Sequence, residues 1–115
     1  MVEDEMMVSL LVEEILADQK CVVVGPFDRI EGALKAARME RVDVAILDVN
    51  LAGVMSYPIA DILAGRGIPF LFLSGYGDSA IPTAHPDWRV CSKPFKSMDL
   101  ISKLLERAGG VASRV

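Results

Sequence analysis

The chain has 115 residues, of which 52% are hydrophobic and 24% are charged, and its formal net charge is −4. This length and composition fit one globular domain over residues 1–115 and exclude a chain that is disordered throughout. The acidic balance and the scattered lysines and arginines exclude a nucleic-acid-binding surface. No apolar run reaches the ~20 residues of a membrane span, and the acidic start is unlike a basic secretory leader. We therefore expect a cytoplasmic protein without nucleic-acid or membrane partners.

Helices and strands alternate along the first half of the chain. Apolar residues recur at intervals of three and four over Met6–Asp18, which predicts an amphipathic helix. The β-branched run at residues 21–25 predicts a strand. Asp28, followed three residues later by Glu31, has the spacing of a capping box and predicts the start of another helix. The continuous apolar run at residues 42–49 predicts a central strand that is buried on both faces.

The second half of the chain continues the alternation, with one weak stretch. Ser56 is a good N-cap for a helix that Gly65 ends, and Pro58 is tolerated in its first turn. Residues 75–88 hold two glycines and two prolines where the alternation requires a helix, so this fourth helix is expected to be short or irregular. Ser97 is the expected cap of the closing helix. The predicted elements are a helix over residues 57–64, strands over residues 68–74 and 89–92, and a helix over residues 97–107.

Short buried strands that alternate with helices predict an α/β fold, a doubly wound parallel sheet with helices on both faces. Ligands of such folds bind at the carboxyl ends of the strands. The residues that end the strands are therefore the candidates for a functional site. The polar ones among them are Glu3, Asp4, Asp48, Ser74 and Lys93.

These five side chains have complementary chemistry. Carboxylates of Glu3, Asp4 and Asp48 at one sheet edge repel each other and need a cation, and a site with only oxygen ligands suits Mg²⁺ better than Ca²⁺. The Ser74 hydroxyl and the Lys93 ammonium suit phosphoryl oxygens. Each residue alone also fits an ordinary cap, loop hydroxyl or surface charge. Their order at successive strand ends favours a phosphoryl-transfer site.

Four motifs carry a resemblance to a known family: VEDE at residues 2–5, ILDVNL at residues 46–51, FLSGY at residues 72–76 and KPF at residues 93–95. With them the sequence resembles the receiver domain of bacterial two-component response regulators over nearly its whole length. The resemblance implies a single (βα)5 flavodoxin-like sheet with strand order 2-1-3-4-5 and a truncated first strand. The FLSGY motif and Tyr57-Pro58 further resemble the single-domain receivers of alphaproteobacteria.

The resemblance to receiver domains implies a Mg²⁺ site and the residues that form it. Asp4 and Asp48 are expected to bind the ion through their carboxylates. Asn50 is expected to bind it through its backbone carbonyl. Glu3 is expected to act through a bound water molecule. Mg²⁺ is the only cofactor that this resemblance implies.

The resemblance also implies the handling of a phosphoryl group. Asp48 is expected to accept that group from a sensor histidine kinase or a histidine phosphotransfer protein, as an acyl phosphate. Ser74 is expected to hydrogen-bond the group and Lys93 to pair with it, with a cis Lys93–Pro94 bond. The chain is then a signalling domain rather than an enzyme, apart from its own phosphotransfer and autodephosphorylation. We expect a monomer or weak homodimer that acts on a downstream partner that the sequence leaves open.

The expected switch region departs from the family pattern. The family carries an aromatic residue three positions before the lysine, where this chain has Val90. Trp88, two residues earlier, points to the same face only if the strand is regular. Transfer of the signal through residues 75–88 is the alternative, and we expect that segment to be mobile in the unphosphorylated state. Tyr76 is expected to overhang the pocket and to shield the acyl phosphate from water.

The first strand is almost missing, because only Met1 and Val2 precede the acidic residues. Either residues precede Met1 in the natural protein, or this strand is short and the fold is correspondingly less stable.

Two other functions stay open at this point. One is a receiver-like interaction module that binds its partner without phosphorylation. The other is a small phosphohydrolase of the haloacid dehalogenase type, which also orders an aspartate, a hydroxyl and a lysine along a doubly wound sheet. That family requires Asp-x-Asp at the nucleophile, and here Asn50 stands at the third position.

Overall fold

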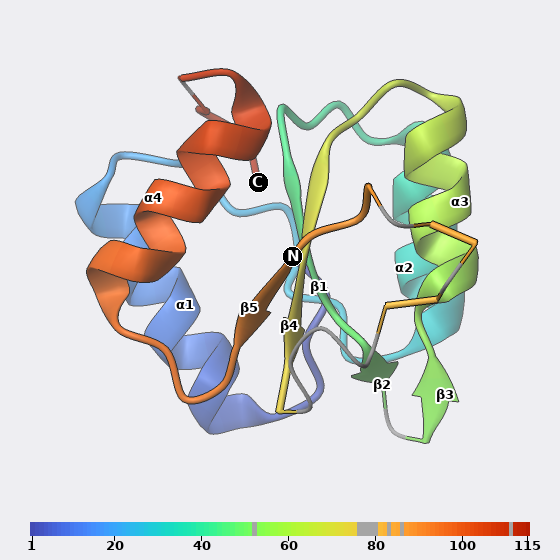
Figure 1. Cartoon of the computed structure of the whole chain (residues 1–115), viewed down its shortest axis with the longest axis horizontal. Coiled ribbons are helices and arrows are strands. Elements are labelled where there is room, and N and C mark those ends of the chain that lie inside the picture. The colour runs from blue at the N-terminus through green and yellow to red at the C-terminus, as the bar shows by residue number, and fades with distance from the viewer. Residues whose placement is uncertain (52, 76–80, 83, 86, 111) are drawn as a thin grey trace.

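Three parallel strands form the centre of the molecule in the order β1 (Ala45–Asp48), β4 (Phe70–Ser74), β5 (Val90–Ser92) (Figure 1). The computed structural model describes residues 1–51, 53–75, 81–82, 84–85, 87–110 and 112–115. All residues of β1 and β4 are buried, as the uninterrupted apolar runs predict for strands covered on both faces. Both strands are shorter than the apolar runs that contain them, and the sheet is parallel as expected.

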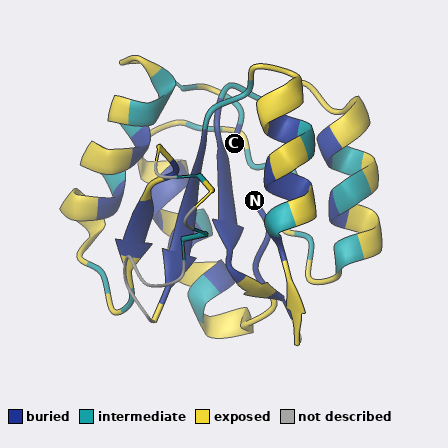
Figure 2. Ribbon diagram, turned by 45° about the vertical axis from the view of Figure 1, so that its right-hand side comes forward, coloured by how far each residue is buried: buried dark blue, intermediate teal, exposed yellow. Residues whose placement is uncertain are grey.

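Helices cover both faces of this sheet (Figure 1). The helices α1 (Met6–Asp18) and α4 (Ser97–Ala108) lie on one face, and α2 (Ile30–Met39) and α3 (Tyr57–Gly65) lie on the other. Each face has its own buried hydrophobic cluster. Figure 2 shows the same arrangement as buried strands between helices with exposed outer surfaces. The doubly wound α/β fold is thereby confirmed.

The order of the sheet also agrees with the expectation, although its first two strands are not regular. Val2 forms parallel bridges to Phe27 on one side and to Leu47 of β1 on the other. The segment that leads to Phe27 is therefore outermost, Val2 comes next, and β1, β4 and β5 follow. If the five extended segments are numbered along the chain, starting with Val2 and the segment that leads to Phe27, their order in the sheet is 2-1-3-4-5. The first of these segments is reduced to a single bridged residue, Val2.

The predicted strand at residues 21–25 is wrong as a continuous strand. Apart from the bridge at Phe27, this stretch has only an isolated bridge from Val22 to Arg114 among the described residues. The chain is interrupted at Gly25, which has φ +108° and is followed by a cis Gly25–Pro26 bond. A β-branched run predicts extended backbone correctly, but a continuous strand also needs a continuous partner, and here Arg114 bridges Val22 while Val2 bridges Phe27.

Helix α1 has the predicted bounds but buries a different face from the one its apolar residues suggest. Its buried residues are Ser9, Val12, Ile15 and Leu16. The apolar side chains nearer its start face solvent. Met6 is 75% exposed, Met7 80%, Leu10 55% and Leu11 45%.

The predicted helix starts were correct to within two residues, but the predicted capping bonds are absent. Helix α2 begins at Ile30 after Arg29 and not at Asp28, because the chain is still extended at Arg29, with φ −133° and ψ 152°. Ser56 is the residue before α3, yet its buried hydroxyl has no hydrogen-bond partner in the described structure. Ser97 is the first residue of α4 rather than its cap.

Two further segments complete the fold. A short antiparallel hairpin of β2 (Asn50–Leu51) and β3 (Val54–Met55), which the sequence did not predict, follows β1. Between β4 and β5, the described residues contain turns and no helix, in agreement with the expected short or irregular fourth helix. The predictions about Tyr76 and about the mobility of residues 75–88 fall largely outside the described residues. None of the described helices has the length and apolar character of a membrane span.

Gly25 gives a test of this arrangement. A Cβ atom at Gly25 would lie 2.8 Å from the Met1 carbonyl oxygen, and its φ of +108° is unfavourable for other residues. We expect Gly25→Ala to lower the free energy of unfolding by about 2 kcal/mol. Gly65→Ala is the control, because nothing lies within 4 Å of its Cβ position and it ends a helix. Urea unfolding measures both variants, and equal effects would contradict the strain at Gly25.

Candidate functional site

The parallel register brings the predicted residues together at one edge of the sheet. Asp48 pairs with Leu73, one residue before Ser74, and Ser74 pairs with Ser92, one residue before Lys93. The Lys93 N–H donates to the Ser74 carbonyl oxygen at 2.8 Å. Asp48 and Ser74 are buried. Three strand ends thus deliver a carboxylate, a hydroxyl and an ammonium to the same place.

The acidic pair reaches this edge through the bridge at Val2. The Val2 N–H donates to the Ile46 carbonyl at 2.8 Å, and the Asp48 N–H donates to the Val2 carbonyl at 2.8 Å. Because Val2 lies against β1, the residues that follow it extend past the end of that strand beside Asp48. One carboxylate oxygen from each of Glu3, Asp4 and Asp48 lies within 4.8 Å of the others.

The Lys93 ammonium lies among these carboxylates. Its Nζ is 3.2 Å from Glu3 Oε2, 3.3 Å from Asp48 Oδ1 and 3.5 Å from Glu5 Oε1. The side chains of Glu3 and Asp48 are 0% and 8% exposed, so two of the three pairs are shielded from water. Glu5 was not predicted as a partner. Its position two residues after Glu3 is the signal, since alternate residues of an extended chain point the same way.

The donor set fits a hard divalent cation. Its oxygens come from carboxylates without any histidine or cysteine, which favours Mg²⁺ over softer metals. Glu3 Oε2 is buried and has no hydrogen-bond partner in the described structure, although Lys93 pairs with it ionically. A buried carboxylate oxygen without a hydrogen bond is costly, and a cation relieves that cost. The side-chain oxygen of Asn50 accepts the Gly53 N–H at 2.8 Å, so that side chain is engaged in the hairpin turn.

An open pocket of about 750 Å³ lies over these groups. Besides Glu5 and Val49, its lining includes two residues of the next elements that were not predicted as site residues: Met55 from β3 and Tyr57 from the first turn of α3. Met55 was missed because each strand of the hairpin has only two residues, too few for an alternating pattern, although Asn50 and Gly53 are turn residues. Tyr57, in contrast, follows a recognisable N-cap. The complete lining is Asp4, Glu5, Asp48, Val49, Asn50, Met55, Tyr57, Ser74, Gly75 and Lys93.

The charges at the site shift its protonation equilibria. Burial, together with the hydrogen bond and negative charge of Glu3, raises the pKa of Asp48 to about 8, although the Lys93 charge acts in the opposite direction. Burial alone would lower the pKa of Lys93, but the charges of Asp48 and Glu3 outweigh it and raise that pKa. The cluster therefore carries more negative charge than one ammonium compensates.

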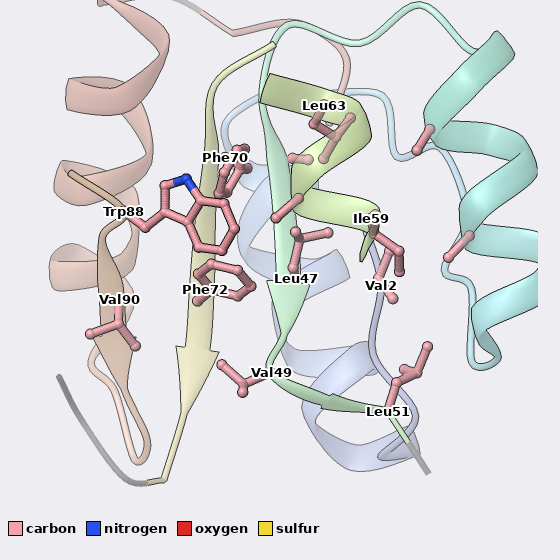
Figure 3. Close-up of a cluster of buried hydrophobic side chains, with 14 residues drawn as sticks. Val2, Leu47, Val49, Leu51, Ile59, Leu63, Phe70, Phe72, Trp88 and Val90 are labelled. Carbon is pink, nitrogen blue, oxygen red and sulfur yellow. The ribbon is translucent and has the colours of Figure 1, made fainter. Parts of the chain in front are cut away.

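The residues around the expected switch position form an aromatic cluster on the α3 face of the sheet (Figure 3). Trp88 and Val90 are both buried in this cluster, so Trp88 does point to the same face as Val90. The Trp88 ring lies 6.3 Å from that of Tyr57 and 5.5 Å from that of Phe72. His85 stacks on Trp88 with ring centroids 3.7 Å apart. The Lys93–Pro94 bond is cis in the structure.

Fold and site together define a flavodoxin-like α/β domain with an acidic site at the carboxyl edge of its sheet. The chain belongs to the response regulator receiver domain family, which it matches over residues 1–105. This result confirms the resemblance that the four motifs carry. No curated protein sequence gives a significant match to this chain.

Solved structures support the same assignment. The solution structure of SdrG from Sphingomonas melonis Fr1 is 38% identical, with a TM-score of 0.80 over 93% of this chain and 91% of that chain. The receiver domain of the sensor histidine kinase PA1611 from Pseudomonas aeruginosa PAO1 was solved with a magnesium ion coordinated in its active site cleft. It is 21% identical, with a TM-score of 0.79 over 95% of this chain and 94% of that chain. At that identity the likeness concerns the fold.

Proposed function

We propose that this chain is a phosphoacceptor of a two-component system that takes a phosphoryl group on Asp48 in a Mg²⁺-dependent step. The observation that carries the proposal is the placement of the Lys93 ammonium 3.3 Å from Asp48 at the mouth of an acidic pocket. An isolated structural salt bridge does not require two further carboxylates beside it. A phosphoryl-transfer site does, because it needs a metal as well as a lysine.

The proposed step is a displacement at phosphorus. An Asp48 carboxylate oxygen forms a bond to phosphorus while the bond to the imidazole nitrogen of the donor histidine breaks, and that nitrogen keeps the electron pair. Lys93 pairs with a phosphoryl oxygen, and the Ser74 hydroxyl at the neighbouring strand end donates a hydrogen bond to another. Both residues line the same pocket, which supports a step that requires little reorganisation.

The proposed metal site uses the carboxylates of Asp4 and Asp48, the backbone carbonyl of Asn50, and Glu3 through a water molecule. When bound, Mg²⁺ would neutralise the charge that develops on the phosphoryl oxygens. Three carboxylates within 4.8 Å of one another support this assignment. The magnesium coordinated in the PA1611 receiver domain is consistent with it.

The proposed donor is a sensor histidine kinase or a histidine phosphotransfer protein, which must dock beside the pocket. Helix α1 starts directly after Glu5, which lines the pocket, and its exposed apolar residues Met6, Met7 and Leu10 offer a surface for such a partner. We propose that the domain itself is a monomer or weak homodimer in the cytoplasm.

Intact mass measurement after incubation with Mg²⁺ and acetyl phosphate tests the proposal. We expect one phosphoryl adduct on the wild-type chain and none on Asp48→Ala, with Asp61→Ala as the exposed-carboxylate control. A chain that forms no adduct would instead act as an interaction module independent of phosphorylation. Continuous turnover of a phosphate ester would indicate a phosphohydrolase.

Mg²⁺ affinity is expected to rise with pH. Without metal, the pKa of Asp48 is about 8, so at pH 6–7 this carboxyl is protonated and Mg²⁺ has to displace the proton. The affinity should therefore increase about tenfold per pH unit up to about pH 8 and level off above it. Calorimetric titration from pH 6 to pH 9 measures the slope. Asp48→Asn has no proton to release, and the same slope in that variant would contradict the assignment.

A further inference from the structure

The C-terminal residues Ser113–Val115 lie in the sheet, in line with the short first strand. The Val22 N–H donates to the Ser113 carbonyl at 2.7 Å, and the Val115 N–H donates to the Val22 carbonyl at 2.9 Å. On the opposite side, the Asp43 N–H donates to the Arg114 carbonyl at 2.8 Å. The segment therefore pairs with both neighbours, as a central strand does. Figures 1 and 2 both place the N and C ends close together beside the strands.

Met1 continues the same line. The Met1 amine donates to the Val24 carbonyl at 2.8 Å, and the Val24 N–H donates to the Val115 backbone oxygen at 2.8 Å. In a parallel ladder, a residue bonds in this way to the residues before and after its partner. Val115 and Met1 therefore occupy the strand positions on either side of the position opposite Val24, with room for one residue between them.

The segment is also held by its side chains. The Asp43 carboxylate accepts the Ser113 N–H at 2.8 Å, the Ser113 hydroxyl at 2.9 Å and the Arg114 N–H at 3.0 Å. Arg114 Nε donates to the Arg41 carbonyl at 2.6 Å. The Val115 side chain is 0% exposed and belongs to the hydrophobic cluster on the α1 and α4 face, together with Met1. Backbone, polar and apolar contacts therefore all fix the same register.

We propose that the slot between residues 22–24 and Asp43 is a β-strand binding site, that Ser113–Val115 is its occupant, and that this segment positions the acidic pair Glu3 and Asp4. The segment and Met1 form one composite strand, which leads directly into that pair. Loss of the segment would leave the Val22 and Val24 amides without their acceptors and would release Met1 from the Val115 side of the ladder. The claim about positioning rests on the proposed Mg²⁺ function, whereas the claim about the slot does not.

Amide hydrogen exchange tests the slot directly. In the wild-type chain we expect the amides of Val22, Val24 and Asp43 to be protected like that of Phe72, which lies in the ladder of β4. Val115→Asp should increase all three exchange rates by about a hundredfold, because it places a charge in the apolar cluster. Exchange of these amides at loop rates in the wild-type chain would overturn the proposal.

Thermal unfolding and Mg²⁺ titration separate the slot from the acidic pair. Val115→Asp should lower Tm by about 10 °C more than Val22→Asp, the matched change at a residue that is 57% exposed in the same ladder. We expect its Mg²⁺ affinity to fall at least tenfold relative to that control. Equal Tm values of Val115→Asp and Val22→Asp would contradict the proposed strand binding site. Equal Mg²⁺ affinities of the two variants would contradict the proposed positioning of Glu3 and Asp4. A wild-type chain that binds no Mg²⁺ contradicts the proposed function, while the exchange and Tm results still judge the slot.

A circular permutant tests the same register without a destabilising substitution, so its result does not depend on a variant that unfolds. Residues 110–115 are placed before Met1 and joined to it by one glycine, which opens the chain after Gly109, the exposed C-cap of α4. We expect Tm to be at least that of the wild-type chain and the Val24 amide to stay protected. A Tm as low as that of Val115→Asp would overturn the one-residue register.

Discussion

Lys93→Met is expected to lower the free energy of unfolding by about 3 kcal/mol in the absence of Mg²⁺. The Lys93 ammonium is the cation in contact with Glu3, Glu5 and Asp48, and two of these carboxylates are buried. Removal of one partner from a buried ion pair leaves an uncompensated charge, which typically costs 3–5 kcal/mol. The exposure of Glu5 places this case at the lower end of that range.

The same reasoning predicts what restores stability to Lys93→Met. Mg²⁺ at millimolar concentration should recover most of the loss, because it supplies positive charge to the same carboxylates. The loss should also be smaller below pH 8, because the pKa of Asp48 is about 8 beside Lys93 and rises further without it, so at low pH this carboxyl is protonated in both chains. Urea unfolding with and without Mg²⁺ at pH 6 and pH 9 measures both effects. Lys35→Met, on an exposed position of α2, controls for the loss of one positive charge; an equal loss in that variant would contradict the argument.

The site was accessible from the sequence because Asp48 and Ser74 end their strands and Lys93 follows directly after its strand. The apolar run before Asp48 and the run before Ser74 predict buried strands, and parallel strands place their carboxyl ends at one edge. The order of the residues along the chain was then sufficient to place Lys93 beside them. The sequence therefore predicts best the contacts between residues at the carboxyl ends of neighbouring parallel strands.

The composite first strand was not predictable in this way. Residues 21–25 have the composition of a strand, and the sequence correctly shows that Met1 and Val2 are too few to pair with them. Nothing local to Ser113–Val115 indicates that these residues fill the slot, because the pairing joins segments about ninety positions apart, as the Val22–Arg114 bridge shows. Periodicity reports which backbone is extended, whereas the choice of partner depends on the whole fold.

Trp88→Ala is expected to lower the free energy of unfolding by about 3–5 kcal/mol, the range for removal of a large buried aromatic side chain. Trp88 is 5% exposed and packs edge-on against Phe70 with ring centroids 5.4 Å apart, while Tyr57 and Phe72 lie beside it. Trp88→Phe keeps much of this contact area, so its loss should be smaller by at least 1 kcal/mol. Equal losses in the two variants, measured by urea unfolding, would show that ring packing does not determine the effect.

The position of Trp88 also predicts how the site reports its state. Tyr57 lines the pocket and packs edge-on against Phe72 at 5.9 Å, and both rings adjoin Trp88, the single tryptophan of the chain. A phosphoryl group on Asp48 that displaces Tyr57 therefore changes the surroundings of Trp88, even though Val90 occupies the usual switch position. We expect acetyl phosphate with Mg²⁺ to change the tryptophan fluorescence of the wild-type chain and of Tyr57→Phe, but not that of Asp48→Ala. In Tyr57→Ala the adduct should still form while the fluorescence change is lost; a full change in that variant would exclude Tyr57 as the link between the pocket and the aromatic cluster.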